Sequence, residues 1–213
     1  QISYEEMLEL ASQGAKVLQT RSVELAMRKK TKLSVRSSIK PNKSGTLVTQ
    51  ENSKLENNTV SGIAYTKDEA KITLSKVLDK PGVSSRIFGP LSKGNINVDM
   101  ILQNVSQDGK YANLSFTLPR GDLEKALKIL KKEKSSIGYR KINSSNNISK
   151  ISVVGVGMRS HAGVAQTLFE TLGKNKINIQ VITTSEIKIS ILIDDQFTDL
   201  AVQKLHQAYK LHK

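Results

Sequence analysis

The segment LDKPGVSSRIFGPLSKGNINVDMI, which spans residues 78–101, combines a group that can bind a cation with groups that can bind an anion. Asp79 supplies a carboxylate that can bind a cation. Pro81 and Gly82 stand at the start of a predicted helix, and glycine lets a ligand come close to the backbone. The N-terminus of that helix presents free N–H groups and the positive end of the helix dipole, which favour an anion.

Three polar residues accompany the next predicted strand, namely Asn97, Asp99 and Gln103. We expect them to lie near the start of the helix if the unit pairs as its pattern predicts. Gln103 is the most suggestive of the three, because glutamine is disfavoured in an ordinary half-buried strand. Structural explanations stay open for two residues of the loop itself, since Gly82 serves the turn with or without a ligand and Asp79 can cap a turn.

Part of this segment occurs twice, because residues 160–182 repeat it at an offset of 81 residues. The offset pairs Gly82 with Gly163 and Ile101 with Ile182. A period this long indicates a duplicated small domain and not a solenoid, whose repeats run to roughly 20–50 residues. Units this small often need a neighbour to cover an exposed sheet face.

The first copy is predicted to alternate strands and helices in the order β-α-β-β-α-β. Its helices are expected to start at Pro81 and at Arg120, and Asp108-Gly109 is a typical hairpin turn between its middle strands. The expected strands comprise residues 70–77, 97–106, 111–119 and 139–143.

The second copy repeats this pattern from residue 151 but ends one strand short. It has expected strands at 151–157, 178–186 and 188–195, and expected helices at 162–173 and 197–209. A further strand, residues 61–67, precedes the first copy. The economical solution is that this early strand pairs into the second unit, so that the first unit is inserted inside the second.

The N-terminal part is predicted to begin with a helix over residues 3–13. Ser3 and Glu6 form a capping box that leads into an apolar stripe. A second helix, residues 21–30, is expected to bury Val23, Leu25 and Ala26, and residues 32–38 alternate like a strand. Residues 37–60 are rich in Ser, Asn and Lys and are predicted to be a linker, with a short apolar island at Leu47–Val48.

The composition excludes several classes of function. The 213 residues carry a net charge of +14, but the lysines are scattered along the whole chain, so we expect no dedicated nucleic-acid role. Cysteine is absent, which excludes disulfides and thiolate chemistry, and no metal site is expected. No apolar run approaches the roughly 20 residues of a membrane span, and no signal peptide is visible, so we expect a cytoplasmic protein without a membrane partner. The start at Gln1, inside a helical pattern, suggests a piece of a longer protein.

With these motifs in view, the chain resembles bacterial aspartate kinase. DKPGV with INVDMILQNVS, and VGMRSHAGV with INIQVITTSEIKISILI, resemble the paired ACT domains of that family. ISYEEMLELASQGAKVL with RSVELA, KLSVRSS and SGTLV resembles the end of its amino-acid-kinase domain. The resemblance covers nearly the whole chain, in the order of the family.

The resemblance implies an α+β chain of tandem ferredoxin-like βαββαβ ACT domains, preceded by a remnant of an amino-acid-kinase α/β domain. The kinase end and linker would comprise residues 1–50, the first ACT domain 68–147, and the second 148–213 together with strand 61–67. The whole enzyme would transfer phosphate from ATP, with Mg, to L-aspartate and form 4-phospho-L-aspartate, the first step of lysine, threonine and methionine biosynthesis. Since no glycine-rich phosphate loop or catalytic constellation is present, we expect no cofactor and no kinase activity in the 213 residues alone.

The resemblance also implies a regulatory site for lysine, threonine or both, which act as feedback inhibitors. A free amino acid is a zwitterion, so its carboxylate suits a helix N-terminus and its ammonium suits an anion such as Asp79. The effector positions implied by the family in the first unit are Asp79, Lys80, Pro81, Gly82, Val83, Ser84, Asn97, Val98, Asp99, Gln103 and Ser106. Those expected from the second unit, across a homodimer interface, are Val164, Ala165, Asn178, Ile179, Ser185 and Glu186. Lys16, in GAKVL, matches a nucleotide-contacting lysine of the whole enzyme.

Some alternatives stay open at this point. Ala165 stands where relatives often have threonine, and His161-Ala162 replaces Lys80-Pro81, so the second unit either binds ligand or mainly dimerises. A ferredoxin-like RNA-binding module has the same element order, but the strands lack its stacking aromatics. A regulatory subunit of another amino-acid pathway is the third reading, and residues 1–50 argue against it.

Overall fold

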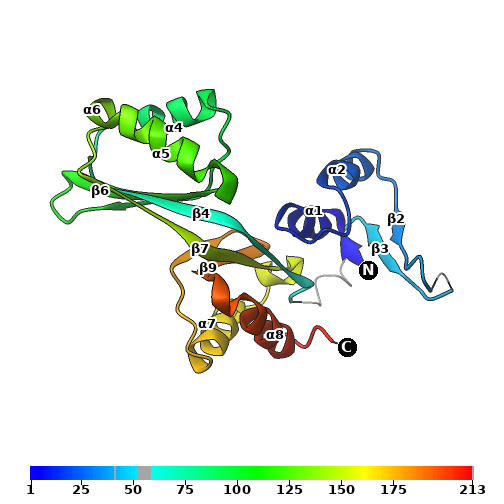
Figure 1. Cartoon of the computed structure of the whole chain (residues 1–213). Coiled ribbons are helices and arrows are strands. Elements are labelled where there is room, and N and C mark those ends of the chain that lie inside the picture. Colours follow the sequence, from blue (N-terminus) through cyan, green and yellow to red (C-terminus); the bar gives the residue numbers. More distant parts are fainter. Residues whose placement is uncertain (41, 52–58, 213) are drawn as a thin grey trace. The chain divides into compact units, whose positions relative to one another are not determined.

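The computed structural model describes residues 1–40, 42–51 and 59–212, so part of the expected linker 37–60 lies outside the described residues. The chain divides into two compact units (Figure 1). One unit comprises Lys67–Ile148, and the other comprises Gln1–Thr66 together with Ser149–Lys213. No helix in the described ranges is long and apolar enough to cross a membrane.

The N-terminal part is a small three-stranded sheet with the order β1-β3-β2 and two helices. Its elements are β1 (Ile2–Ser3), α1 (Tyr4–Ser12), α2 (Thr20–Arg28), β2 (Leu33–Val35) and β3 (Thr46–Thr49). The predicted capping box of α1 is confirmed, because the Glu6 N–H donates to Ser3 Oγ at 3.1 Å and Glu6 Oε2 accepts from the Ser3 N–H at 2.9 Å.

Two predictions for this part were wrong. Leu47–Val48 is not an island in a linker, because both residues belong to β3, where Val48 is paired with Ile2 and Leu33 and fully buried. Leu25 does not belong to the inner face of α2, since it is 55% exposed. Val23 and Ala26, which are three residues apart, form that face alone.

The two longest strands also differ from expectation. The strands expected at 61–67 and 70–77 form one strand, β4 (Gly62–Leu78), and the strands expected at 139–143 and 151–157 join into β7 (Lys141–Val154). Polar residues lie in the middle of each of these strands. Backbone pairing depends on N–H and C=O groups, and it therefore continues through polar side chains.

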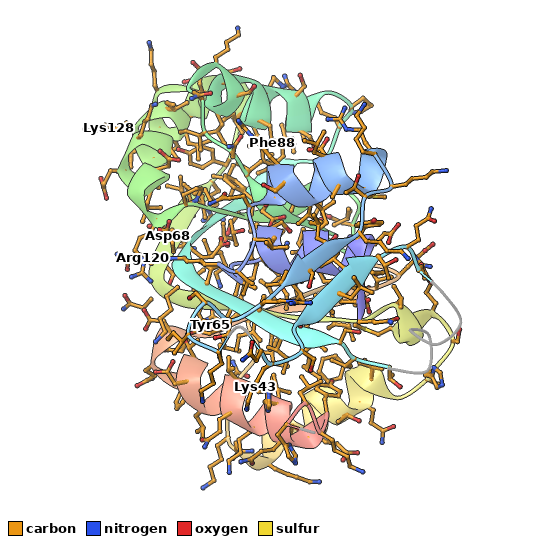
Figure 2. All side chains as sticks on the ribbon, turned by 90° about the vertical axis from the view of Figure 1, so that its right-hand side faces the viewer. Lys43, Tyr65, Asp68, Phe88, Arg120 and Lys128 are labelled. Atoms are coloured by element: carbon orange, nitrogen blue, oxygen red, sulfur yellow. The ribbon has the colours of Figure 1, made fainter. Side chains whose placement is uncertain are left out.

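The unit Lys67–Ile148 has the β-α-β-β-α-β order and arranges its strands as β5-β6-β4-β7. Its elements besides the two long strands are α4 (Val83–Lys93), β5 (Asp99–Val105), β6 (Tyr111–Leu118), η1 (Arg120–Asp122), α5 (Leu123–Lys132) and α6 (Lys134–Ile137). Its core includes Ile72, Ile87 and Phe116, which come from the sheet and α4. Figure 2 shows Asp68 beside Arg120, whose N–H donates to Asp68 Oδ1 at 3.2 Å.

The second βαββαβ set arranges its strands as β4-β7-β9-β8. It contains η2 (Val156–Arg159), α7 (Val164–Lys174), β8 (Val181–Thr184), β9 (Lys188–Asp194), η3 (Asp195–Phe197) and α8 (Thr198–Ala208). The Ser61 N–H donates to Val154 O at 2.8 Å, so the early strand pairs with β7. Val153 packs with α7 and α8, whereas Val154 packs with α1, because neighbouring strand residues point to opposite faces.

Candidate functional site

The first candidate site lies in the loop between β4 and α4. Gly82 precedes α4 with φ of +84°, a conformation that glycine adopts without strain. A Cβ placed on Gly82 would meet no atom within 4 Å, so the start of α4 is open. The Val83 N–H donates to Lys80 O at 3.3 Å, which holds the loop against the helix. An anion can therefore reach the backbone at this helix N-terminus.

Asp79 and Gln103, two of the expected site residues, are in direct contact. Gln103 Nε2 donates to Asp79 Oδ1 at 3.1 Å, and the Asp79 N–H donates to Lys110 O at 3.0 Å. Ser106 lies at the same end of the sheet, where its Oγ donates to Asp108 Oδ1 at 2.6 Å. A carboxylate, a carboxamide and an open helix N-terminus thus lie together at one end of the sheet.

Asn97 and Asp99 do not lie near the start of α4, and the expectation that they would was wrong; Val98 lies between them. Leu78 is opposite Tyr111 on β6, whereas Asp99 is opposite Thr117. Six strand residues separate these positions, or about 20 Å. Because α4 runs away from the loop before β5 begins, the start of β5 belongs to the far end of the unit.

The far end has its own irregularity. The register of β5 shifts between Asp99 and Leu102, and Met100 has φ of +45° there. Asp99 Oδ1 accepts the Met100 N–H at 2.8 Å. Asn97 is exposed, while Val98 packs on the core of the unit. This bulge re-aims the exposed residues of an edge strand.

The equivalent loop of the second set is arranged differently. Arg159 Nη1 lies 3.2 Å from each oxygen of Glu51, and Arg159 Nε lies 3.4 Å from Glu186 Oε2. Gly163 has φ of +99°, and a Cβ on it would meet nothing within 4 Å. At the offset of 81 residues, Arg159 and Ser160 stand where the first copy has Leu78 and Asp79, so this loop carries a cation next to the position of the first loop's carboxylate, and the sequence signal for it was the difference between MRSHAG and LDKPG.

The remaining expected residues of the second set lie at two ends. Val164 is buried and its C=O accepts from the Tyr209 hydroxyl at 2.8 Å, while Ala165 is half-buried. Asn178 and Ile179 precede β8, and Ser185 and Glu186 follow it, the latter two beside the Arg159 loop. Lys16 is exposed in the turn after α1.

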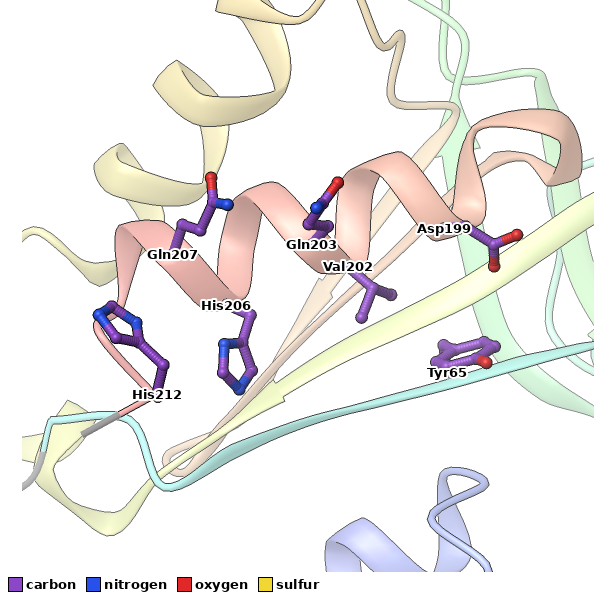
Figure 3. Close-up of a pocket in the computed structure, with 7 residues that line it drawn as sticks. All are labelled: Tyr65, Asp199, Val202, Gln203, His206, Gln207 and His212. Carbon is purple, nitrogen blue, oxygen red and sulfur yellow. The ribbon is translucent and has the colours of Figure 1, made fainter.

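Among the described residues, hollows lie at two places in the unit that contains both chain ends. One, of about 520 Å³, lies between α8 and Tyr65 of β4 and is lined also by His206, His212 and Asp199 (Figure 3). The other, of about 1000 Å³, lies between the Arg159 loop and the N-terminal part. Of the expected site residues only Val164 lines either hollow. Within the described residues, no group of three or more His, Asp or Glu side chains is placed to hold a metal ion.

Comparisons with known proteins agree with this architecture. Residues 75–133 and 151–209 match the family described as ACT domain. An aspartokinase of Pseudomonas aeruginosa is 49% identical over 212 residues, which is 99% of this chain and 51% of that protein. The chain thus spans about half the length of the curated relatives it matches.

Solved structures extend the comparison. The ligand-free regulatory subunit of aspartate kinase from Thermus thermophilus is 33% identical, covers 70% of this chain and 98% of its own, and has a TM-score of 0.66. E. coli aspartokinase III in complex with lysine and aspartate is 25% identical, with coverages of 96% and 45% and a TM-score of 0.71. The chain therefore belongs to the ACT domain family, with two copies of that domain, and corresponds to the regulatory ACT region of aspartokinases.

Proposed function

We propose that the chain binds lysine, threonine or both and thereby inhibits an aspartate kinase, of which it is the regulatory region. The whole protein would use ATP and Mg in the cytoplasm to phosphorylate aspartate, and residues 1–50 would complete its kinase domain. The 213 residues alone would have no kinase activity. The observation that carries the proposal is the open start of α4 beside the Asp79 carboxylate, in a chain that is 49% identical to an aspartokinase.

The chemistry of this loop suits a free amino acid. The α-carboxylate would accept N–H groups at the start of α4, and the α-ammonium would donate to Asp79. Gln103 already donates to Asp79 and would orient that carboxylate. The lysine in the related E. coli structure supports this class of ligand.

A homodimer would complete the site. Asn97 and Asp99 lie at the opposite end of β5 from Asp79, so one unit by itself cannot close over a ligand. β5 and β8 are edge strands, and an antiparallel partner strand would bring its own start beside the end of β5. We therefore propose that Asn178 and Ile179 of a second copy supply the other wall.

Calorimetric titration of the chain with lysine and with threonine tests the proposal. We expect at least one of the two to bind, and we expect Asp79→Asn to weaken binding about 10- to 100-fold, because a hydrogen bond to a charged group contributes roughly 1.5–3 kcal/mol. Asp122→Asn, at the start of α5, is the matched control and should bind as the wild type does.

The proposal fails if neither amino acid binds, or if Asp79→Asn binds with unchanged affinity. Single-stranded RNA titrated at moderate salt provides the comparison with the nucleic-acid alternative. Salt-sensitive RNA binding without any response to amino acids would favour that alternative.

A further inference from the structure

The Glu6 carboxylate makes more contacts than its capping role requires. It is fully buried, and its Oε2 accepts from the N–H and the hydroxyl of Ser3, both at 2.9 Å. Its Oε1 accepts from Ser61 Oγ at 2.5 Å and from the Val156 N–H at 2.9 Å. A capping box needs only the Ser3 contacts, so the second oxygen has a different role. It joins α1 to Ser61, directly before β4, and to Val156, which follows β7.

Val156 begins loop 156–163, which leads from β7 to α7, and the last four residues of this loop match Asp79–Gly82 of the candidate effector loop. A further contact fastens this loop, because Arg159 pairs with Glu51, two residues after β3. Gly155, directly before the loop, approaches Thr59 so closely that a Cβ on it would lie 2.4 Å from Thr59 O, and only glycine fits there. By contrast, Asp79 in the first loop contacts Lys110 and Gln103 of its own unit.

The other end of α1 is held as well. Ser152 Oγ lies 3.3 Å from Gln13 Oε1, to which it donates, and Lys188 Nζ lies 2.9 Å from Glu9 Oε2. Gly14 follows with φ of +111°, directly against the Tyr65 carbonyl. Lys16 comes two residues later. The helix is therefore a short rigid element with Glu6 near one end and Lys16 just beyond the other.

We propose that Glu6 is a positioning residue that transmits a movement of loop 156–163 to α1, and through α1 to Lys16. This inference rests on the proposed function, because the effector supplies the movement. The physical reason is that a buried carboxylate cannot leave its donors without leaving Val156 and Ser61 unsatisfied. The loop and the helix must therefore move together.

Hydrogen exchange of the 213-residue chain, with and without saturating lysine or threonine, tests the coupling. In the wild type we expect the effector to change exchange in peptides that cover residues 79–84, 156–163 and 4–16. Glu6→Gln offers one acceptor oxygen in place of two, so it cannot satisfy Ser3 and Val156 at once. The effector-induced change over residues 4–16 should then fall at least about threefold, while the changes over 79–84 and 156–163 persist.

Glu5→Gln, which alters the neighbouring carboxylate of the same helix, is the matched control and should respond as the wild type does. If Glu6→Gln prevents folding, Ser61→Ala removes one of the two Oε1 contacts and should reduce the same change in part. A merely structural Glu6 would raise exchange over 4–16 equally with and without effector and leave the effector-induced difference intact. That result would overturn the inference.

The outcomes separate the inference from the proposed function. An effector that protects residues 79–84 of the wild type but changes nothing over 4–16 contradicts the role of Glu6 alone. An effector that changes no peptide contradicts the proposed function and removes the basis of the inference with it.

Discussion

Gly14→Ala should destabilise the chain strongly, although it adds only one methyl group. Gly14 ends α1 with φ of +111°, where residues with a side chain are strained. A Cβ at this position would lie 2.4 Å from Tyr65 O, well inside the 3.0 Å that real Cβ atoms keep. The backbone of α1 and that of β4 would have to separate.

The magnitude follows from these two terms. The backbone conformation costs on the order of 1–3 kcal/mol for a residue other than glycine, and the displaced contact adds to it, so we expect a loss of roughly 2–4 kcal/mol. For a chain of this length that corresponds to a fall in melting temperature of roughly 5–15 °C. Because α1 packs against Ala64 of β4 and Val154 of β7, the loss of stability should fall on the unit that holds both chain ends.

Differential scanning calorimetry measures this effect, and Gly173→Ala is the control. Gly173 lies inside α7, and a Cβ there would meet nothing within 4 Å. The same chemical change should therefore stabilise the chain by about 0.5–1 kcal/mol. A Gly14→Ala protein that melts within a degree of the wild type would refute the reasoning, as would equal destabilisation by Gly173→Ala.

Two further predictions concern burial and pH. Burial raises the pKa of Tyr209 above its usual value of 10.0, so above pH 10 the phenol ionises in the unfolded chain before it does in the folded one, and the free energy of unfolding falls. Tyr209→Phe should reduce this fall, measured by urea unfolding between pH 10 and 12. An unchanged dependence of the unfolding free energy on pH would contradict the prediction. Phe116 is fully buried, and its ring centroid lies 5.3 Å from that of Phe88. Phe116→Ala should therefore lower the free energy of unfolding by about 3–5 kcal/mol in the same assay. Leu25→Ala, at an exposed position, should change it by no more than about 0.5 kcal/mol. Equal effects of these two alanine substitutions would show that burial does not set the cost.

Local features were predictable because their causes are local. The capping box needs only Ser3 and Glu6, three residues apart, and the hairpin turn needs Gly109 with φ of +66°. The position of α4, which begins at Val83 directly after Gly82 and two residues after the expected Pro81, follows from the same kind of information. These elements formed where the sequence pattern indicated because the interactions that stabilise them lie within a few residues.

The pairing of the early strand with β7 was predicted, but the partners and the register of other distant segments were not. Val48 looked like an island in a polar stretch because β1 and β2, which bury it, come from elsewhere in the sequence. Asn97 and Asp99 were expected beside the loop, but the register of β5 on β6 places them at the far end. Periodicity shows which face a residue occupies, and it does not show which partner residue lies opposite.

The sequence by itself determined the duplication, the βαββαβ order and the chemistry of the Asp79–Gly82 loop. Spacing and residue type are sufficient for those conclusions. Only the tertiary structure decided that Gln103 contacts Asp79, and that Glu6 joins the N-terminal helix to Val156, 150 residues away. A buried carboxylate takes its partners from whichever donors the fold brings within hydrogen-bond distance, and a one-dimensional pattern does not contain that distance.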